Sequence, residues 1–85
     1  MAVTMLRPRE VWKRCGNSRS SYYAAVKAGL MVRPVKIGER AVATPDYEVD
    51  QVNAARIAGK SPEEVTALVK QLEAARGHDG QKAQL

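Results

Sequence analysis

Apolar residues recur at helical spacing most clearly between residues 61 and 77. Ser61 and Glu64 form the capping-box pattern at the start of this segment, and Pro62 suits the first helical position. Gly77 follows the last turn and favours a stop there. The pattern therefore predicts a C-terminal helix. Its apolar positions fall at i, i+3, i+4 and i+7 and form one stripe, which comprises Val65, Leu68, Val69 and Leu72.

Two shorter helices are predicted nearer the N-terminus, one on each side of a glycine-containing turn. The first lies in "RPREVWKRCG", where Pro8 suits the first helical position and Gly16 the end. The second runs from about residue 19 to residue 28, with Ser18 as its N-cap and Gly29 as its left-handed exit. Two helices joined by so short a turn predict a helix-turn-helix.

The segment "RPVKIGERAVAT" predicts a β-hairpin, with strands over about 34–37 and 40–44. Gly38 is expected to begin a two-residue turn between them. A third helix should follow, with Thr44 as its cap and Pro45 in the first position. The residues of this third helix that are expected to face inward are Val49, Val52 and Ile57.

Together these elements predict one α+β domain that is mostly α. Residues 1–59 form a helix-turn-helix with a two-stranded hairpin, residues 60–77 add an extra C-terminal helix, and residues 78–85 form a disordered tail. The stripe on the extra helix has two interpretations. It either covers the protein's own core or contacts a neighbouring protomer or another protein.

Positive charge is concentrated in the N-terminal half of the chain. Residues 1–44 hold nine Lys and Arg against two Glu, a net charge of +7, whereas residues 45–85 have a net charge of −2. A concentrated positive field attracts phosphate chains and speeds their association. The distribution therefore favours a nucleic-acid partner for the first half.

The sequence offers little from which to build an enzyme. The single histidine, His78, lies in the expected tail, and the single cysteine, Cys15, is interpreted as a small core residue. Together they give no metal-ligand spacing and no nucleophile–base pair, so we expect no catalytic site, metal or cofactor. No apolar run is long enough to cross a membrane, and the low cysteine content fits the cytoplasm.

The second helix instead carries side chains of the types that contact DNA in other proteins. Arginine pairs with guanine, serine with several bases, and tyrosine and lysine with phosphates or bases. Tyr22 is interpreted as a core residue. The residues predicted to enter the major groove are Ser18, Arg19, Ser20, Ser21, Tyr23 and Lys27. Those predicted to contact phosphates or the adjacent minor groove, from the hairpin and the first helix, are Lys36, Gly38, Arg40, Arg9 and Lys13.

The combination of motifs resembles the AlpA family of small phage and prophage regulators, which are related to excisionases and to the winged-helix domain of MerR-type proteins. The resemblance covers roughly residues 5–56. The matching motifs are Glu10–Val11, Gly16, Ser18-Arg19-Ser20, Tyr23, Lys27-Ala28-Gly29, Pro34 to Val42 and Glu48-Val49-Asp50.

This resemblance implies a winged helix-turn-helix that binds double-stranded DNA, with Ser18–Lys27 in the major groove and the loop around Gly38–Arg40 as the wing. Family members regulate transcription of mobile-element genes or act as excisionases. We expect an excisionase-like recombination directionality factor that binds and bends attachment-site DNA, self-associates there and cooperates with an integrase. A transcriptional regulator is the alternative within this class.

Two function classes compete with DNA binding. One is a protein-interaction module, such as an antitoxin or an integrase adaptor, that makes no DNA contact. The other is an RNA-binding protein, which is disfavoured because no aromatic stacking platform is visible in the sequence.

Overall fold

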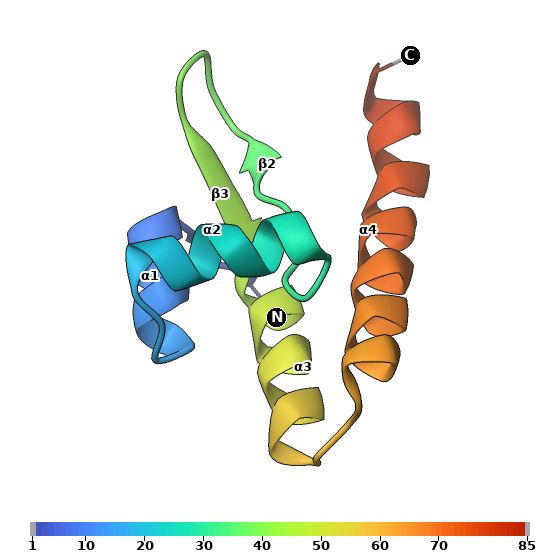
Figure 1. Ribbon diagram of the computed structural model, residues 1–85. Coiled ribbons are helices and arrows are strands. Elements are labelled where there is room, and N and C mark those ends of the chain that lie inside the picture. The colour runs from blue at the N-terminus through green and yellow to red at the C-terminus, as the bar shows by residue number, and fades with distance from the viewer. Residues whose placement is uncertain (1, 85) are drawn as a thin grey trace.

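The helix-turn-helix lies on one side of the molecule and the long C-terminal helix on the other, with the hairpin extending beyond the helix-turn-helix (Figure 1). The computed structural model describes residues 2–84, and the side chains of residues 2–76. In chain order the elements are β1 (Met5–Leu6), α1 (Pro8–Arg14), α2 (Arg19–Ala28), β2 (Val35–Lys36), β3 (Val42–Pro45), α3 (Asp46–Ile57) and α4 (Pro62–Gln84). This order confirms the predicted α+β, mostly helical fold.

The sheet contains a strand that the sequence did not predict. The strand order is β1-β3-β2, and both pairs are antiparallel. Leu6 pairs with Thr44, and Val35 pairs with Ala43. β1 has only two residues and its partner is distant in the chain, so neither alternation nor a turn marks it. The wing hairpin is therefore tied into a three-stranded sheet rather than standing as a two-stranded ribbon.

The turn of the hairpin differs from the expected type. Gly38 does not adopt a positive φ, which a glycine-first two-residue turn requires. The backbone N–H groups of Ile37 and Gly38 both donate to the Ala41 carbonyl, at 2.9 and 3.3 Å. β2 ends at Lys36 rather than at residue 37, and β3 begins at Val42 rather than at residue 40. A longer loop thus joins them, and no residue in it needs a left-handed backbone.

The start of α3 is also built differently from the prediction. Thr44 does not cap this helix, because it lies in β3 and is 1% exposed. The N-cap is Pro45, whose side chain makes no capping hydrogen bond. Instead the backbone N–H of Asp46 donates to the carbonyl of Thr4, at 2.9 Å. The segment leading into β1 therefore satisfies a helix-start N–H that a capping side chain usually satisfies.

The core joins all four helices and the sheet. Tyr22 of α2 and Val49 and Val52 of α3 are fully buried, as predicted, whereas Ile57 is 87% exposed and its predicted inward orientation is wrong. Ile57 is the last residue of α3, where the helix has passed the edge of the core. Burial raises the pKa of the Tyr22 phenol, and the nearby Thr44 hydroxyl works against this rise.

The stripe on α4 closes the core of its own protomer. Val65, Val69 and Leu72 are 3, 3 and 8% exposed, and Leu68 packs against them. The predicted capping box is present, with reciprocal hydrogen bonds of 3.0 and 3.2 Å between Ser61 and Glu64. This burial supports the interpretation that the stripe covers the protein's own core, and its contact with another protein stays a prediction.

The C-terminal end of α4 differs from the prediction. The helix does not stop at Gly77 but continues to Gln84. Glycine lowers helix stability by about 1 kcal/mol relative to alanine, which weakens a helix without forbidding it. The side chains beyond Arg76 lie outside the described residues. The disordered tail over residues 78–85 and the proposed segment boundaries stay predictions.

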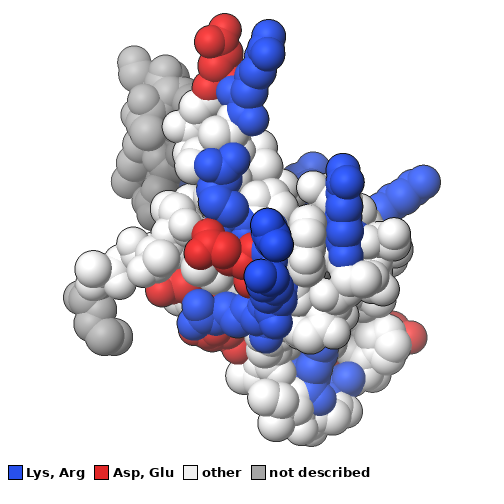
Figure 2. All heavy atoms as spheres, turned by 90° about the vertical axis from the view of Figure 1, so that its left-hand side faces the viewer, with Lys and Arg blue, Asp and Glu red and all other residues white. Residues whose placement is uncertain are grey.

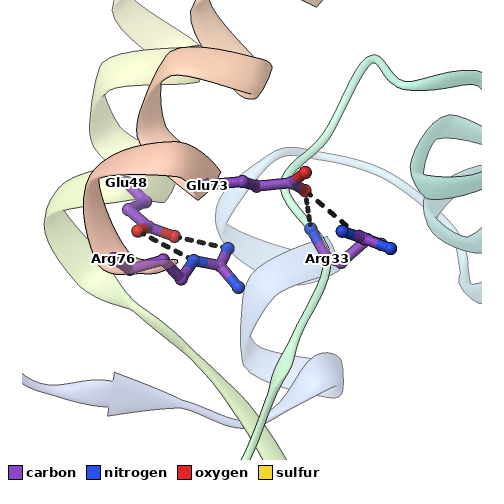
Figure 3. A network of polar contacts seen from close by, with 4 residues as sticks. All are labelled: Arg33, Glu48, Glu73 and Arg76. Atoms are coloured by element: carbon purple, nitrogen blue, oxygen red, sulfur yellow. Dashed lines mark hydrogen bonds and ion pairs between the residues drawn. The ribbon is translucent and has the colours of Figure 1, made fainter. Parts of the chain in front are cut away.

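A polar network joins α4 to the rest of the domain (Figure 3). Arg76 of α4 donates two hydrogen bonds to Glu48 of α3, at 2.8 and 3.2 Å. Glu48 is fully buried, and this burial raises the pKa of its carboxyl, although the Arg76 guanidinium works against the rise. Glu73, one turn earlier, accepts a 2.8 Å hydrogen bond from the backbone N–H of Arg33. A hydrogen bond to a charged group contributes about 1.5–3 kcal/mol, so these contacts hold α4 in a defined place.

Candidate nucleic-acid interface

α2 is positioned by a cap at each end and an anchor in the middle. The hydroxyl of Ser18 accepts a hydrogen bond from the backbone N–H of Ser21, at 3.2 Å, as the sequence predicted. Gly29 ends the helix with a left-handed φ of 79°. Tyr22 is buried between them and fixes the rotation of the helix about its axis. The outward face of α2 is thereby set by the packing of its inward face.

The serines of α2 differ in their availability. The hydroxyls of Ser18 and Ser21 lie 3.1 Å apart and are hydrogen bonded to each other, in addition to the N-cap bond. The Ser20 side chain is exposed and makes no such local bond in the described part of the chain. Among the three serines predicted to contact DNA, Ser20 therefore has the hydroxyl that is freest to reach a base edge.

An aromatic group supports the arginine at the start of α2. The guanidinium carbon of Arg19 lies 5.9 Å from the centre of the Tyr23 ring, within cation–π range. Tyr23 is 46% exposed and packs edge-on against Trp12 of α1, with ring centres 6.3 Å apart. Arg19 and Tyr23 are thus brought together on the surface of α2. The Tyr23 ring limits the orientations of the Arg19 side chain.

The tip of the hairpin is exposed from Lys36 to Arg40. Lys36, Gly38 and Arg40 are all exposed, as a role in phosphate contact requires, and Glu39 lies between them. Ile37 is 50% exposed in the same loop, and the sequence analysis assigned it no role. Ile37 lies at the end of a predicted strand, where the alternating pattern suggested an inward side chain, and the sequence therefore showed no sign of its exposure.

α1 carries further exposed cations. Arg9 and Lys13 are exposed, and so is Arg7 at the start of the helix, which the sequence analysis did not assign. Figure 2, which looks onto the side of the molecule that carries α1, shows Lys and Arg side chains spread over this surface with fewer acidic ones. Arg14 differs, because it forms a bidentate pair with Asp50 of α3 at 2.9 and 3.1 Å.

Most of the positive charge in the first half is therefore available to a partner. Of its nine cations, Arg14 pairs with Asp50 and Arg33 with Glu73. The other seven make no ion pair within the described residues, and all seven side chains are exposed. These seven, the free cations, are Arg7, Arg9, Lys13, Arg19, Lys27, Lys36 and Arg40.

Comparison with protein families identifies the chain. Residues 4–57 match the family model described as prophage CP4-57 regulatory protein (AlpA). The chain belongs to the AlpA family. No curated protein and no solved structure matches it. The AlpA match includes both helices of the helix-turn-helix, the wing and all of α3, so it contains every residue predicted to contact DNA. α4 lies beyond the AlpA match, although its stripe completes the core.

The described residues of this AlpA-family chain contain no group of His, Cys, Asp and Glu that could hold a metal ion. Burial raises the pKa of the half-buried Cys15 thiol, which keeps it in its less reactive protonated form. No helix among the described residues has the length and apolar character needed to cross a membrane.

Proposed function

We propose that this protein is a sequence-specific, double-stranded DNA-binding regulator of a prophage or related mobile element. The observation that carries the proposal is the outward face of α2, where Arg19, Ser20 and Lys27 are exposed while Tyr22 anchors the helix. α2 has ten residues and is ~15 Å long, which suits insertion of its N-terminal half into a major groove about 12 Å wide. Membership of a regulatory prophage family supports the same proposal.

The two parts of the interface are assigned different roles. Arg19 and Ser20, near the N-terminus of α2, read base edges, since this end of a recognition helix reaches deepest. Lys36 and Arg40 on the wing contact phosphates or the neighbouring minor groove, which fixes position without reading sequence. Arg9 and Lys13 of α1 contact the backbone on the other side of α2.

Within this function we place transcriptional regulation first. The expectation of an excisionase-like factor depended on the α4 stripe as a contact between neighbouring copies, and that stripe is buried in its own core. Self-association on DNA and an integrase partner therefore lose their main support.

Excisionase-like bending of attachment-site DNA stays as the second candidate, because one observation favours it. Ile37 is 50% exposed in the wing beside Lys36, and apolar side chains of this kind wedge between base steps in the minor groove and kink the duplex. Footprinting on the promoter of the gene and on the attachment site would separate the two roles. A regulator protects the promoter, whereas a directionality factor protects the attachment site.

Binding to DNA should depend steeply on salt. Five or six of the free cations meet phosphates, because Arg19 is assigned to base edges, and each phosphate neutralised contributes roughly −0.9 to the slope of log affinity against log salt concentration. We therefore expect a slope of about −4.5 to −5.5. Fluorescence anisotropy with a labelled duplex from the DNA flanking the gene, titrated at several salt concentrations, measures it.

A slope shallower than about −2, or no binding at low salt, would contradict the DNA-binding function and favour the protein-interaction module. The matched control is Lys70→Ala, which removes an exposed cation of α4 outside the proposed interface. This variant should leave the slope unchanged.

A further inference from the structure

We propose that α4 holds the connection between the recognition helix and the wing, and that Glu73 is the positioning residue through which it does so. The expected effect on DNA affinity rests on the proposed DNA-binding function, whereas the structural basis of the proposal is independent of that function. It concerns the segment of residues 30–34, here called the connector, which leads from α2 to β2.

The connector is held from two sides. Met31 and Val32 are fully buried in the core cluster that also contains the α4 stripe. The Arg56 guanidinium of α3 donates to the Leu30 carbonyl at 3.3 Å, and the Glu73 carboxylate of α4 accepts from the Arg33 backbone N–H at 2.8 Å. Figure 3 shows the Glu73 side chain extending from α4 to the connector.

The bond from the Arg33 backbone is the important part of the contact with Glu73. The ion pair with the Arg33 guanidinium is long, at 3.6 Å, and the Arg33 side chain is 73% exposed. Solvent screens such a pair almost completely. The Glu73 side chain is only 20% exposed, so its 2.8 Å bond to a backbone N–H is better protected. A change of path in the connector would break this bond.

The position of the connector decides where the wing lies. Only Pro34 separates Arg33 from β2, and the fixed φ of proline leaves little freedom between them. Glu73 is itself held in place, because Arg76 on the next turn of α4 is bound to the buried Glu48. A fixed path therefore runs from α3 through α4 to the base of the wing. This gives α4 a role in DNA binding although it lies beyond the matched family segment.

Two substitutions at Glu73 test the proposal. Glu73→Ala removes the acceptor of the Arg33 N–H, whereas Glu73→Gln keeps a side-chain oxygen that accepts it. Hydrogen exchange followed by NMR should show about tenfold faster exchange of the Arg33 amide in Glu73→Ala, the factor expected for loss of one such bond. Exchange at the wing amides of Ile37 and Gly38 should rise with it. Glu73→Gln should stay close to wild type.

The consequence for function is measured with a random duplex of about 20 base pairs at low salt, because wing contacts do not depend on sequence. Glu73→Ala should weaken binding about threefold to tenfold, as loss of a positioned phosphate contact would. In an Arg40→Ala background the same substitution should cause little further loss, because the affected contact is already gone. Glu63→Ala, an exposed acidic residue of the same helix, is the control and should not weaken binding.

Several results would overturn the proposal. One is an unchanged rate of hydrogen exchange at the wing amides in Glu73→Ala. Another is a loss of DNA affinity in the double variant that equals the product of the losses from Glu73→Ala and Arg40→Ala alone. If Glu73→Ala unfolds, Glu73→Gln is used in its place. Faster exchange of the wing amides in Glu73→Gln would mean that the charge of Glu73, and not its hydrogen bond from the Arg33 N–H, holds the wing. If the wild-type protein binds no duplex at all, the proposed function fails, but the exchange experiment still tests the path from α4 to the wing.

Discussion

Arg76→Ala should lower the free energy of unfolding by about 3–5 kcal/mol at neutral pH, because it leaves the buried carboxylate of Glu48 without its partner. Glu48 is 0% exposed, and within the described residues Arg76 donates both of the hydrogen bonds that its side chain accepts. An 85-residue domain has a total stability of about 5–15 kcal/mol, so this is a large fraction of it. Urea unfolding followed by circular dichroism measures the change, with Lys70→Ala as the control on the same helix.

The effect of Arg76→Ala should shrink as the pH falls. Burial raises the pKa of Glu48 in the folded protein, and Arg76 is the group that opposes this rise. Without Arg76 the pKa is raised further, so the folded variant binds a proton more tightly than the unfolded chain does. The variant therefore regains stability between neutral pH and the usual glutamate pKa of about 4.3. A stability difference that is the same at pH 7 and pH 5, or no gain from adding Glu48→Gln to Arg76→Ala, would contradict this explanation.

The double variant Leu68→Lys with Leu72→Lys should unfold the domain rather than only weaken its association. Leu72 is 8% exposed within the core cluster and Leu68 packs against that cluster. Placing charged groups there costs about 4–5 kcal/mol or more, since they lose water without gaining partners. Circular dichroism at 25 °C should show loss of helix.

The matched control for this double variant is Ile57→Lys on α3, where the side chain is 87% exposed. It should leave stability within about 0.5 kcal/mol of wild type. If instead the double variant stays folded and binds a single site normally but loses cooperativity on a longer fragment, the stripe would be an interface after all. That result would restore the excisionase-like assembly to first place.

Local signals in the sequence predicted the helices well, because capping and exit residues act over a few positions. Ser18, Gly29 and the pair Ser61 and Glu64 all do in the structure what their spacing predicted. The exposure of Arg19 and Lys27 followed from the helical period once Tyr22 was placed in the core.

The features that the sequence did not reveal depend on contacts between distant parts of the chain. β1 exists only because β3 pairs with it, and the N–H of Asp46 is satisfied by the carbonyl of Thr4 rather than by Thr44. The same holds for charge. Nothing near Arg14 in the sequence indicates that Asp50 pairs with it. Only the structure shows that Arg14 is not among the cations available to a partner.

A comparison of Arg19→Ala with Arg40→Ala tests the division between the reading helix and the wing most directly. The measurement is the affinity of each variant for two duplexes, one selected by the wild-type protein from a random pool and one of unrelated sequence. Arg19→Ala should cost about 1–3 kcal/mol on the selected duplex and little on the unrelated one, because a base contact is lost. Arg40→Ala should weaken both equally and make the salt slope shallower by about one unit, because a phosphate contact is lost. Equal losses on both duplexes for both variants would contradict the assignment of α2 as the element that reads sequence.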